Sequence, residues 1–134
     1  MRELPAGRIK AVHRFDWLWE PLESDPTFVL RSMFGSKAIY LHGRMVLCFS
    51  ANAEPWRGML VCTDQERHPS LVQSFPALRP HPHLGKWLYI RESNDAFESM
   101  AQKIVRAVRD RDPRIGVIPP LKKRTRKGQR PRRS

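Results

Sequence analysis

The segment from Met33 to Ser50 constrains the fold of this chain more than any other stretch. Within it, two runs rich in strand-forming residues, Ala38–Leu41 and Met45–Phe49, flank the dipeptide His42-Gly43. Glycine tolerates the positive φ angle that a two-residue hairpin turn requires, and β-branched and aromatic neighbours favour strands on both sides. The segment therefore predicts a β-hairpin. It holds no carboxylate pair and no phosphate-binding loop, so it predicts an architecture and not an activity.

The same segment carries a family resemblance. The tripeptide Met33-Phe34-Gly35 is followed in register by Ile39-Tyr40-Leu41 and by Gly43-Arg44-Met45, and this arrangement resembles the N-terminal domain of the TfoX/Sxy competence regulators. That family is related in fold to the YjbR-type proteins. The resemblance implies a compact two-layer fold of sheet and helices, pairing as homodimers, and a motif made of Met33, Phe34, Gly35, Tyr40 and Gly43.

Further elements follow from periodicity and from the positions of proline. They are a helix at Phe15–Glu23 that Pro21 shortens or kinks, strands at Thr27–Met33, Trp56–Cys62 and Lys86–Arg91, and a short helix at Pro69–Phe75. The stretch before the last of these strands contains Pro76, Pro80 and Pro82. We expect an irregular loop there, because each proline lacks a backbone donor.

The clearest predicted helix begins near Asp95 and ends before Pro113. Its apolar residues recur every three or four positions and form a continuous stripe, namely Phe97, Met100, Ala101, Ile104, Val105 and Val108. Asp95 and Glu98 have the spacing of a capping box at its start. Together, the elements predict a two-layer α+β fold, in which three helices pack on an antiparallel sheet of about five strands in the order α-β4-α-β-α.

Charge divides the chain unevenly. The formal net charge is +12, and residues 121–134 supply eight positive side chains and no acidic one. The 120 residues before them carry 17 basic and 13 acidic side chains. We therefore expect an N-terminal extension at residues 1–12, one domain at 13–120 and a disordered basic tail at 121–134.

The basic tail is predicted to contact DNA or RNA, because each neutralised phosphate releases counterions and gives a sequence-independent, salt-sensitive affinity. The residues expected to make these contacts are Lys122, Lys123, Arg124, Arg126, Lys127, Arg130, Arg132 and Arg133. A tail that only keeps the protein soluble explains the same charge and stands as the alternative. A protein partner, or a second copy of the chain, is expected to bind the folded core.

Neither a membrane segment nor a signal peptide is predicted. The longest apolar run, Met45–Phe49, is far shorter than the roughly 20 residues of a membrane helix. We therefore expect a cytoplasmic protein without membrane contact. In that compartment Cys48 and Cys62 are expected to be buried, reduced thiols.

Candidate chemistry outside the tail is sparse. His81-Pro82-His83 places two imidazoles on the same side of an extended backbone, but a zinc site needs a third or fourth ligand, which no nearby cysteine supplies. No serine or cysteine stands in a recognisable nucleophile motif. The four Trp residues fall in apolar-periodic segments and are expected in the core, with Trp56 the exception at a strand edge. We expect no catalytic residue, no metal and no cofactor.

The sequence favours a non-enzymatic binding or regulatory module that contacts nucleic acid through its tail. The alternative is a small-molecule-binding protein or an enzyme that uses a pocket between helices and sheet, with His81, His83 or Tyr89 contributing. A concave site with several convergent polar groups would favour this alternative.

Overall fold

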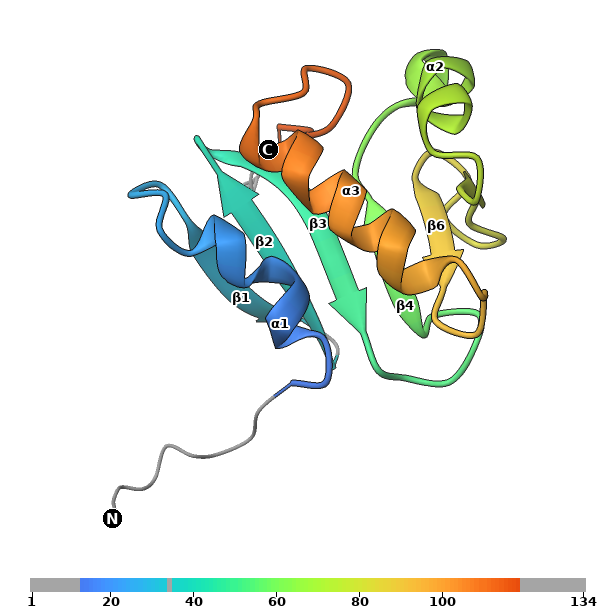
Figure 1. Cartoon of the computed structure of the whole chain (residues 1–134), viewed down its shortest axis with the longest axis horizontal. Coiled ribbons are helices and arrows are strands. Elements are labelled where there is room, and N and C mark those ends of the chain that lie inside the picture. Colours follow the sequence, from blue (N-terminus) through green and yellow to red (C-terminus); the bar gives the residue numbers. More distant parts are fainter. Residues whose placement is uncertain (1–12, 34, 119–134) are drawn as a thin grey trace, which may run out of the picture.

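A six-stranded antiparallel sheet forms the centre of the computed structural model, which describes residues 13–33 and 35–118 (Figure 1). The strands, in the spatial order β1-β2-β3-β4-β6-β5, are β1 (Val29–Met33), β2 (Ser36–Leu41), β3 (Arg44–Ser50), β4 (Gly58–Val61), β6 (Leu88–Arg91) and β5 (Arg79–Pro80). The helices are α1 (Asp16–Trp19), α2 (His68–Ser74) and α3 (Phe97–Arg109), with short 3₁₀ helices at Glu20–Leu22 and Gln65–Arg67. The predicted α+β class, an antiparallel sheet with three helices, is confirmed.

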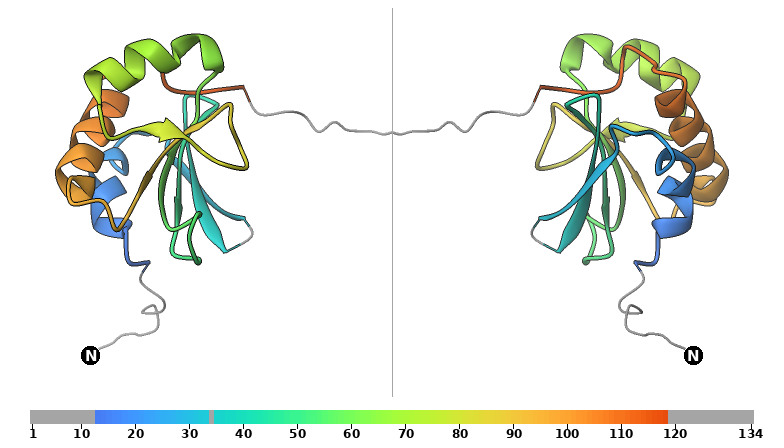
Figure 2. Two further views of the ribbon diagram at one scale, coloured as in Figure 1. Left: turned by 90° about the vertical axis from the view of Figure 1, so that its right-hand side faces the viewer. Right: turned by 90° about the vertical axis from the view of Figure 1, so that its left-hand side faces the viewer.

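The helices and the sheet form two layers. Helices α1 and α3 lie side by side on one face of the sheet, and α2 lies at one end of it (Figure 2). No described helix covers the opposite face, where Leu84 and Trp87 of the loop before β6 pack against a small apolar cluster that includes Cys48 and Cys62. Both cysteines are buried and free, as expected.

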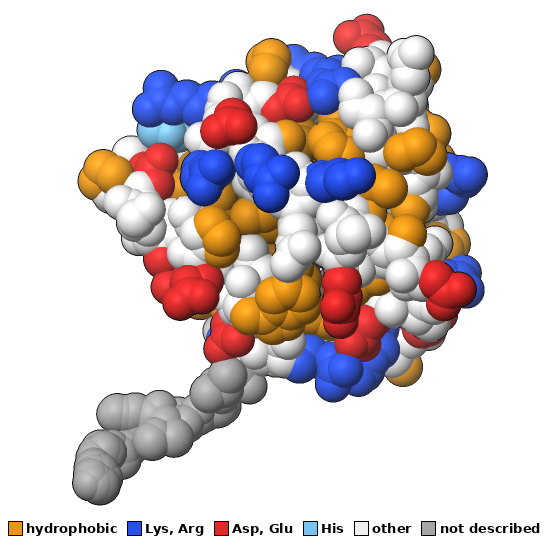
Figure 3. All heavy atoms as spheres, in the orientation of Figure 1, with side chains coloured by type: hydrophobic (Ala, Val, Ile, Leu, Met, Phe, Trp, Pro, Cys, Tyr) orange, Lys and Arg blue, Asp and Glu red, His pale blue; other side chains and the backbone are white. Residues whose placement is uncertain are grey.

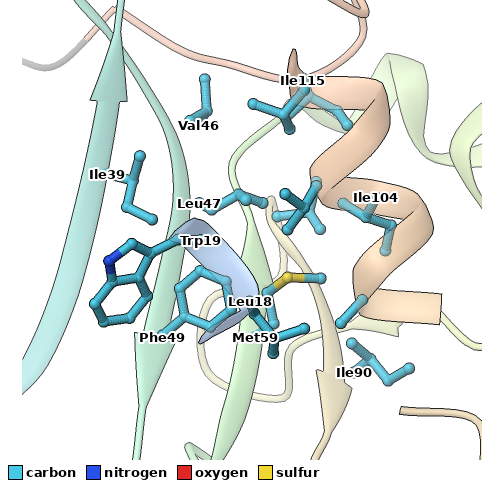
Figure 4. Close-up of a cluster of buried hydrophobic side chains, with 14 of the residues drawn as sticks. Leu18, Trp19, Ile39, Val46, Leu47, Phe49, Met59, Ile90, Ile104 and Ile115 are labelled. Atoms are coloured by element: carbon cyan, nitrogen blue, oxygen red, sulfur yellow. The ribbon is translucent and has the colours of Figure 1, made fainter. Parts of the chain in front are cut away.

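The main core lies between α3 and the sheet. The stripe predicted for α3 faces inward, with Phe97, Ala101, Ile104, Val105 and Val108 all buried. Figure 4 shows Ile104 directed toward side chains of the central strands. Burial of one such aliphatic side chain contributes about 1.5–3 kcal/mol, so this stripe fixes the helix on the sheet.

The hairpin predicted from the sequence joins β2 to β3. His42 and Gly43 both adopt positive φ, at 53° and 76°, as a two-residue turn of type I′ requires. Leu41 pairs directly with Arg44 across this turn. Gly35, just before β2, also has a positive φ of 79°, which its missing side chain allows.

Several local expectations were wrong. Trp17 is 42% exposed and not part of the core, because Leu18 and Trp19 are the residues of α1 that face the sheet. The capping box is absent: α3 has Ala96 as its N-cap with no side-chain cap bond, and the Asn94 side chain instead accepts a hydrogen bond from the Ala96 amide at 2.8 Å.

The strands also differ from the prediction: β1 and β6 begin at Val29 and Leu88, two residues later than expected. Strand β4 begins at Gly58, which leaves Trp56 in the preceding loop. The proline-containing stretch, expected to be a loop, contributes the two-residue strand β5, in which Pro80 pairs with Leu88 at the edge of the sheet. An edge position tolerates proline because one side of the strand needs no amide donor.

Candidate ligand-binding pocket

A pocket of about 340 Å³ opens between the turn of the β2–β3 hairpin and the C-terminal end of α3. Its apolar walls come from Leu41, Val46, Val108, Pro113 and Ile115. Its polar lining consists of His42, Arg44, Arg111 and Asp112. Figure 4 shows Val46 of β3 and Ile115 of the segment after α3 together at this end of the core. The volume falls within the range of roughly 300–1,000 Å³ that is usual for small-molecule sites.

Hydrogen bonds to the loop before β1 hold the hairpin side of the pocket in place. The Asp25 carboxylate accepts hydrogen bonds from the amide and the hydroxyl of Thr27 at 2.8 and 2.6 Å. The Thr27 hydroxyl oxygen in turn accepts a hydrogen bond from the His42 amide at 2.9 Å. The His42 ring returns toward Asp25, with Nε2 3.4 Å from the carboxylate. The turn is thus tied to the loop before β1.

The helix side of the pocket is a Schellman-type end of α3. The Arg111 amide donates to the Val108 carbonyl at 2.9 Å, and the Asp112 amide donates to the Ala107 carbonyl at 3.0 Å. This motif requires a residue in the left-handed conformation, and Arg111 supplies it with a φ of 64°. Glycine is the usual residue here, because its missing Cβ avoids the steric penalty.

Two strained backbone positions therefore lie at the pocket. Within residues 13–33 and 35–118, His42 and Arg111 are the two non-glycine residues with positive φ, and both line this pocket. Strained backbone that persists at a particular place in a fold is a pointer to function.

The segment that follows α3 closes the back of the pocket against the sheet. Val117 and Met45 exchange backbone hydrogen bonds, each at 2.9 Å, and the Gly116 amide donates to the Cys62 carbonyl at 2.7 Å. The Gly116 carbonyl accepts a hydrogen bond from Nη2 of Arg44 at 2.8 Å. A Cβ at position 116 would lie 3.1 Å from Nε of Arg44, so glycine makes room for this guanidinium.

The carboxylate of Asp112 in the pocket lining and that of Asp25 beside His42 are already bound by other groups. Both Asp112 oxygens accept hydrogen bonds from the Arg114 guanidinium, at 3.0 and 2.7 Å, and these bonds hold the pKa of Asp112 below its ordinary value. The hydrogen bonds from Thr27 lower the pKa of Asp25 in the same way. Arg44 and Arg111 make no ion pair with any described residue, so the lining has an excess of positive charge.

The residues proposed from the sequence for a pocket form a different cluster. His81, His83 and Tyr89 do come together, joined by Trp56, whose ring stacks on His83 with centroids 5.7 Å apart. His81 is 1% exposed, and its Nε2 lies 2.7 Å from the Pro55 carbonyl. Its Nδ1 accepts the amides of His83 and Leu84 at 3.0 and 3.1 Å.

The polar atoms of His81 and Tyr89 in this aromatic cluster already have hydrogen-bond partners within the protein. Burial lowers the pKa of His81 and raises that of Tyr89 to about 12, so both side chains are neutral at pH 7. The Tyr89 hydroxyl donates to the Arg57 carbonyl at 2.6 Å. The cluster locks the loop before β6 onto the sheet, and none of its members lines the pocket described above.

The partner prediction is corrected here. The tail residues Lys122, Lys123, Arg124, Arg126, Lys127, Arg130, Arg132 and Arg133 lie outside the described residues, as does Phe34 of the motif. The described residues balance 14 Lys and Arg against 12 Asp and Glu, and the face in Figure 3 mixes a row of basic side chains with acidic ones on both sides. The folded part thus offers no dominant charge to a polyanion. Nothing in the described residues supports binding of DNA, RNA, a protein partner or a second copy of the chain, so these predicted partners are withdrawn.

No helix within residues 13–33 and 35–118 is long and apolar enough to cross a membrane. The same residues contain no group of three or more His, Cys, Asp or Glu side chains placed to hold a metal ion.

Fold and pocket together define a two-layer α+β protein with a partly apolar, positively charged pocket at one end of its core. Comparison of the chain with protein-family models, with curated proteins and with solved structures finds no match. The pocket residues Arg44, Arg111 and Asp112 were missed by the sequence reasoning. The signal that could have pointed to Arg111 is a basic residue directly after the last turn of a helix, at the position where glycine is usual.

Proposed function

We propose that this protein is a small-molecule-binding module, and that its ligand occupies the pocket between the β2–β3 turn and the end of α3. The observation that carries the proposal is the convergence of both strained non-glycine residues, His42 and Arg111, on one cavity of about 340 Å³. Apolar walls with a few polar groups are the usual lining of such sites.

Binding rather than catalysis is the function that these side chains support. The carboxylate of Asp112 is held by Arg114 and that of Asp25 by Thr27, so neither is available to a ligand without loss of those bonds. A general base needs an accessible acceptor within reach of the substrate proton. These two carboxylates are therefore assigned no catalytic role, and the pocket is proposed as a recognition site.

A fragment screen followed by protein NMR tests this proposal. Fragments that bind should shift the amide signals of Leu41, Val46 and Ile115 in the unaltered protein. Val46→Trp fills the cavity and should abolish these shifts, whereas Ile118→Trp, at a residue that is 73% exposed, should leave them intact. Binding that maps elsewhere on the protein, or that survives in folded Val46→Trp protein, would contradict the proposal.

Membership in a TfoX-like family is proposed as well. Its support is the positive φ of the two motif glycines, Gly35 and Gly43, on either side of β2. A Cβ at position 35 would also lie 3.1 Å from the Asn52 side chain. Solved structures of family members would test it: a β2–β3 hairpin with both glycines in these conformations is expected, and a different backbone at either position would count against it.

A further inference from the structure

The pocket contains more positive than negative charge that is free to act on a ligand. The exposed Arg111 side chain makes no hydrogen bond or ion pair with residues 13–33 and 35–118. Arg44 uses Nη2 for the Gly116 carbonyl, while its Nε is buried without a hydrogen-bond partner. Because this Nε has almost no accessible surface and packs against Gly116, a ligand in the pocket would meet Nη1 of Arg44, which makes no hydrogen bond with the described residues.

The nearby carboxylates do not supply that charge. Asp112 is engaged by two nitrogens of Arg114, and Asp25 by Thr27 and the His42 ring. The charge of Arg111 acts on Asp25 only as the weakest of the influences on that carboxyl. Both arginines thus keep donors for a ligand.

The backbone gives an independent argument. Glycine would satisfy the left-handed position after α3 with less strain than arginine. An arginine held there despite the strain indicates that the guanidinium itself has a role at the pocket.

We propose that the pocket binds a small organic anion, whose carboxylate or phosphate group is bound by the guanidinium groups of Arg44 and Arg111. The apolar body of this anion packs against Val46, Val108 and Ile115. The proposal rests on the proposed function, since it names the ligand class of the same pocket. Guanidinium groups suit this task because their planar N–H donors bind two oxygens of a carboxylate or phosphate at once.

Three probes with the same apolar body and different head groups test the proposal on the full chain. Nonanoate, octyl phosphate and 1-octanol, which all carry an octyl chain, are titrated by calorimetry at fixed salt. We expect at least one of the two anions to bind at least tenfold more tightly than the alcohol. The anion that binds more tightly identifies the head group as carboxylate or phosphate.

Substitutions of Arg111 and Arg44 test whether these two arginines cause the preference for the anion. Arg111→Gly should reduce the preference for the anion at least fivefold and leave the affinity for 1-octanol within twofold. It is expected to fold, because glycine suits that backbone position. Arg44→Gln should act in the same direction. Arg109→Ala, at an exposed arginine of the last helical turn that does not line this pocket, should retain the preference.

The outcomes separate the two proposals. Equal binding of alcohol and anions, abolished by Val46→Trp, would overturn the anion class and leave the small-molecule pocket standing. An anion preference that Arg111→Gly leaves intact would also overturn the anion class. No binding of any probe at millimolar concentration, together with a fragment screen that finds nothing in the pocket, would overturn both.

Discussion

The α-carbon of Gly58 lies against the backbone carbonyl of Ile90. A Cβ at position 58 would fall 2.3 Å from that oxygen, at a φ of 138° that residues with side chains rarely adopt. Gly58 is the first residue of β4 and pairs with Arg91 of β6, so this close approach sets how these two strands meet. The contact makes glycine a structural requirement at this position.

Replacement of Gly58 tests that requirement. Gly58→Ala should lower the free energy of unfolding by about 2–4 kcal/mol, because the new methyl group meets backbone that cannot move without breaking the β4–β6 pairing. Gly43→Ala is the matched control: its φ is also positive, but a Cβ there meets nothing within 4 Å. It should lose only about 1 kcal/mol, the usual cost of a left-handed alanine. Equal losses in urea unfolding would contradict this account.

The buried His81 makes stability depend on pH. Burial is the largest cause of its lowered pKa, so the folded protein takes up a proton at His81 less readily than the unfolded chain, whose value is near 6.5. The unfolded state therefore binds more protons below that pH, and the free energy of unfolding should fall as pH drops from 7 to 5. His81→Gln should show a shallower fall across this range. An identical slope in both proteins would mean that His81 does not contribute.

Glu92 should contribute stability in a lower pH window. Its carboxylate accepts hydrogen bonds from Arg14 at 2.6 Å and from Arg57 at 2.7 Å. Burial alone raises its pKa, but the two arginines outweigh burial and hold the pKa below 4.5. The contribution of Glu92 to the free energy of unfolding is therefore fully present above pH 4.5. It is lost as pH falls through the lowered pKa that Glu92 has in the folded protein.

Glu92→Gln measures this contribution directly. At pH 7 the variant should be about 1 kcal/mol less stable, a modest figure because both arginines are partly exposed. As pH falls below 4.5 and through the lowered pKa of the folded protein, the difference from the unaltered protein should shrink toward zero. Glu66→Gln, at an exposed carboxylate, is the control and should differ little in either pH range. A difference that stays constant with pH would show that the charge of Glu92 is not responsible.

Local signals were sufficient for the fold and insufficient for the site. The His42-Gly43 turn and the apolar stripe of α3 depend on neighbouring residues, and the structure has both. The pocket joins residues 41–46 to residues 108–115, which meet through the packing of α3 on the sheet and the backbone bridge between Val117 and Met45. Nothing in the spacing of Arg44 and Arg111 along the chain indicates that meeting. The exposure of Trp17 also could not be predicted from the sequence. Periodicity identifies the apolar face of a helix, but it does not show how much of that face the sheet covers.

The conformation of Arg111 leads to a prediction about the free protein. A non-glycine residue with a φ of 64° carries a steric penalty, which glycine avoids. Arg111→Gly should therefore raise the free energy of unfolding by about 0.5–1 kcal/mol, after allowance for the greater entropy of glycine in the unfolded chain. Arg111→Ala keeps the penalty and should remain close to the unaltered protein. Urea unfolding of the three proteins without ligand makes the comparison. If Arg111→Gly is instead less stable than Arg111→Ala, the left-handed position is not strained. The backbone at Arg111 would then give no indication that the arginine binds a ligand.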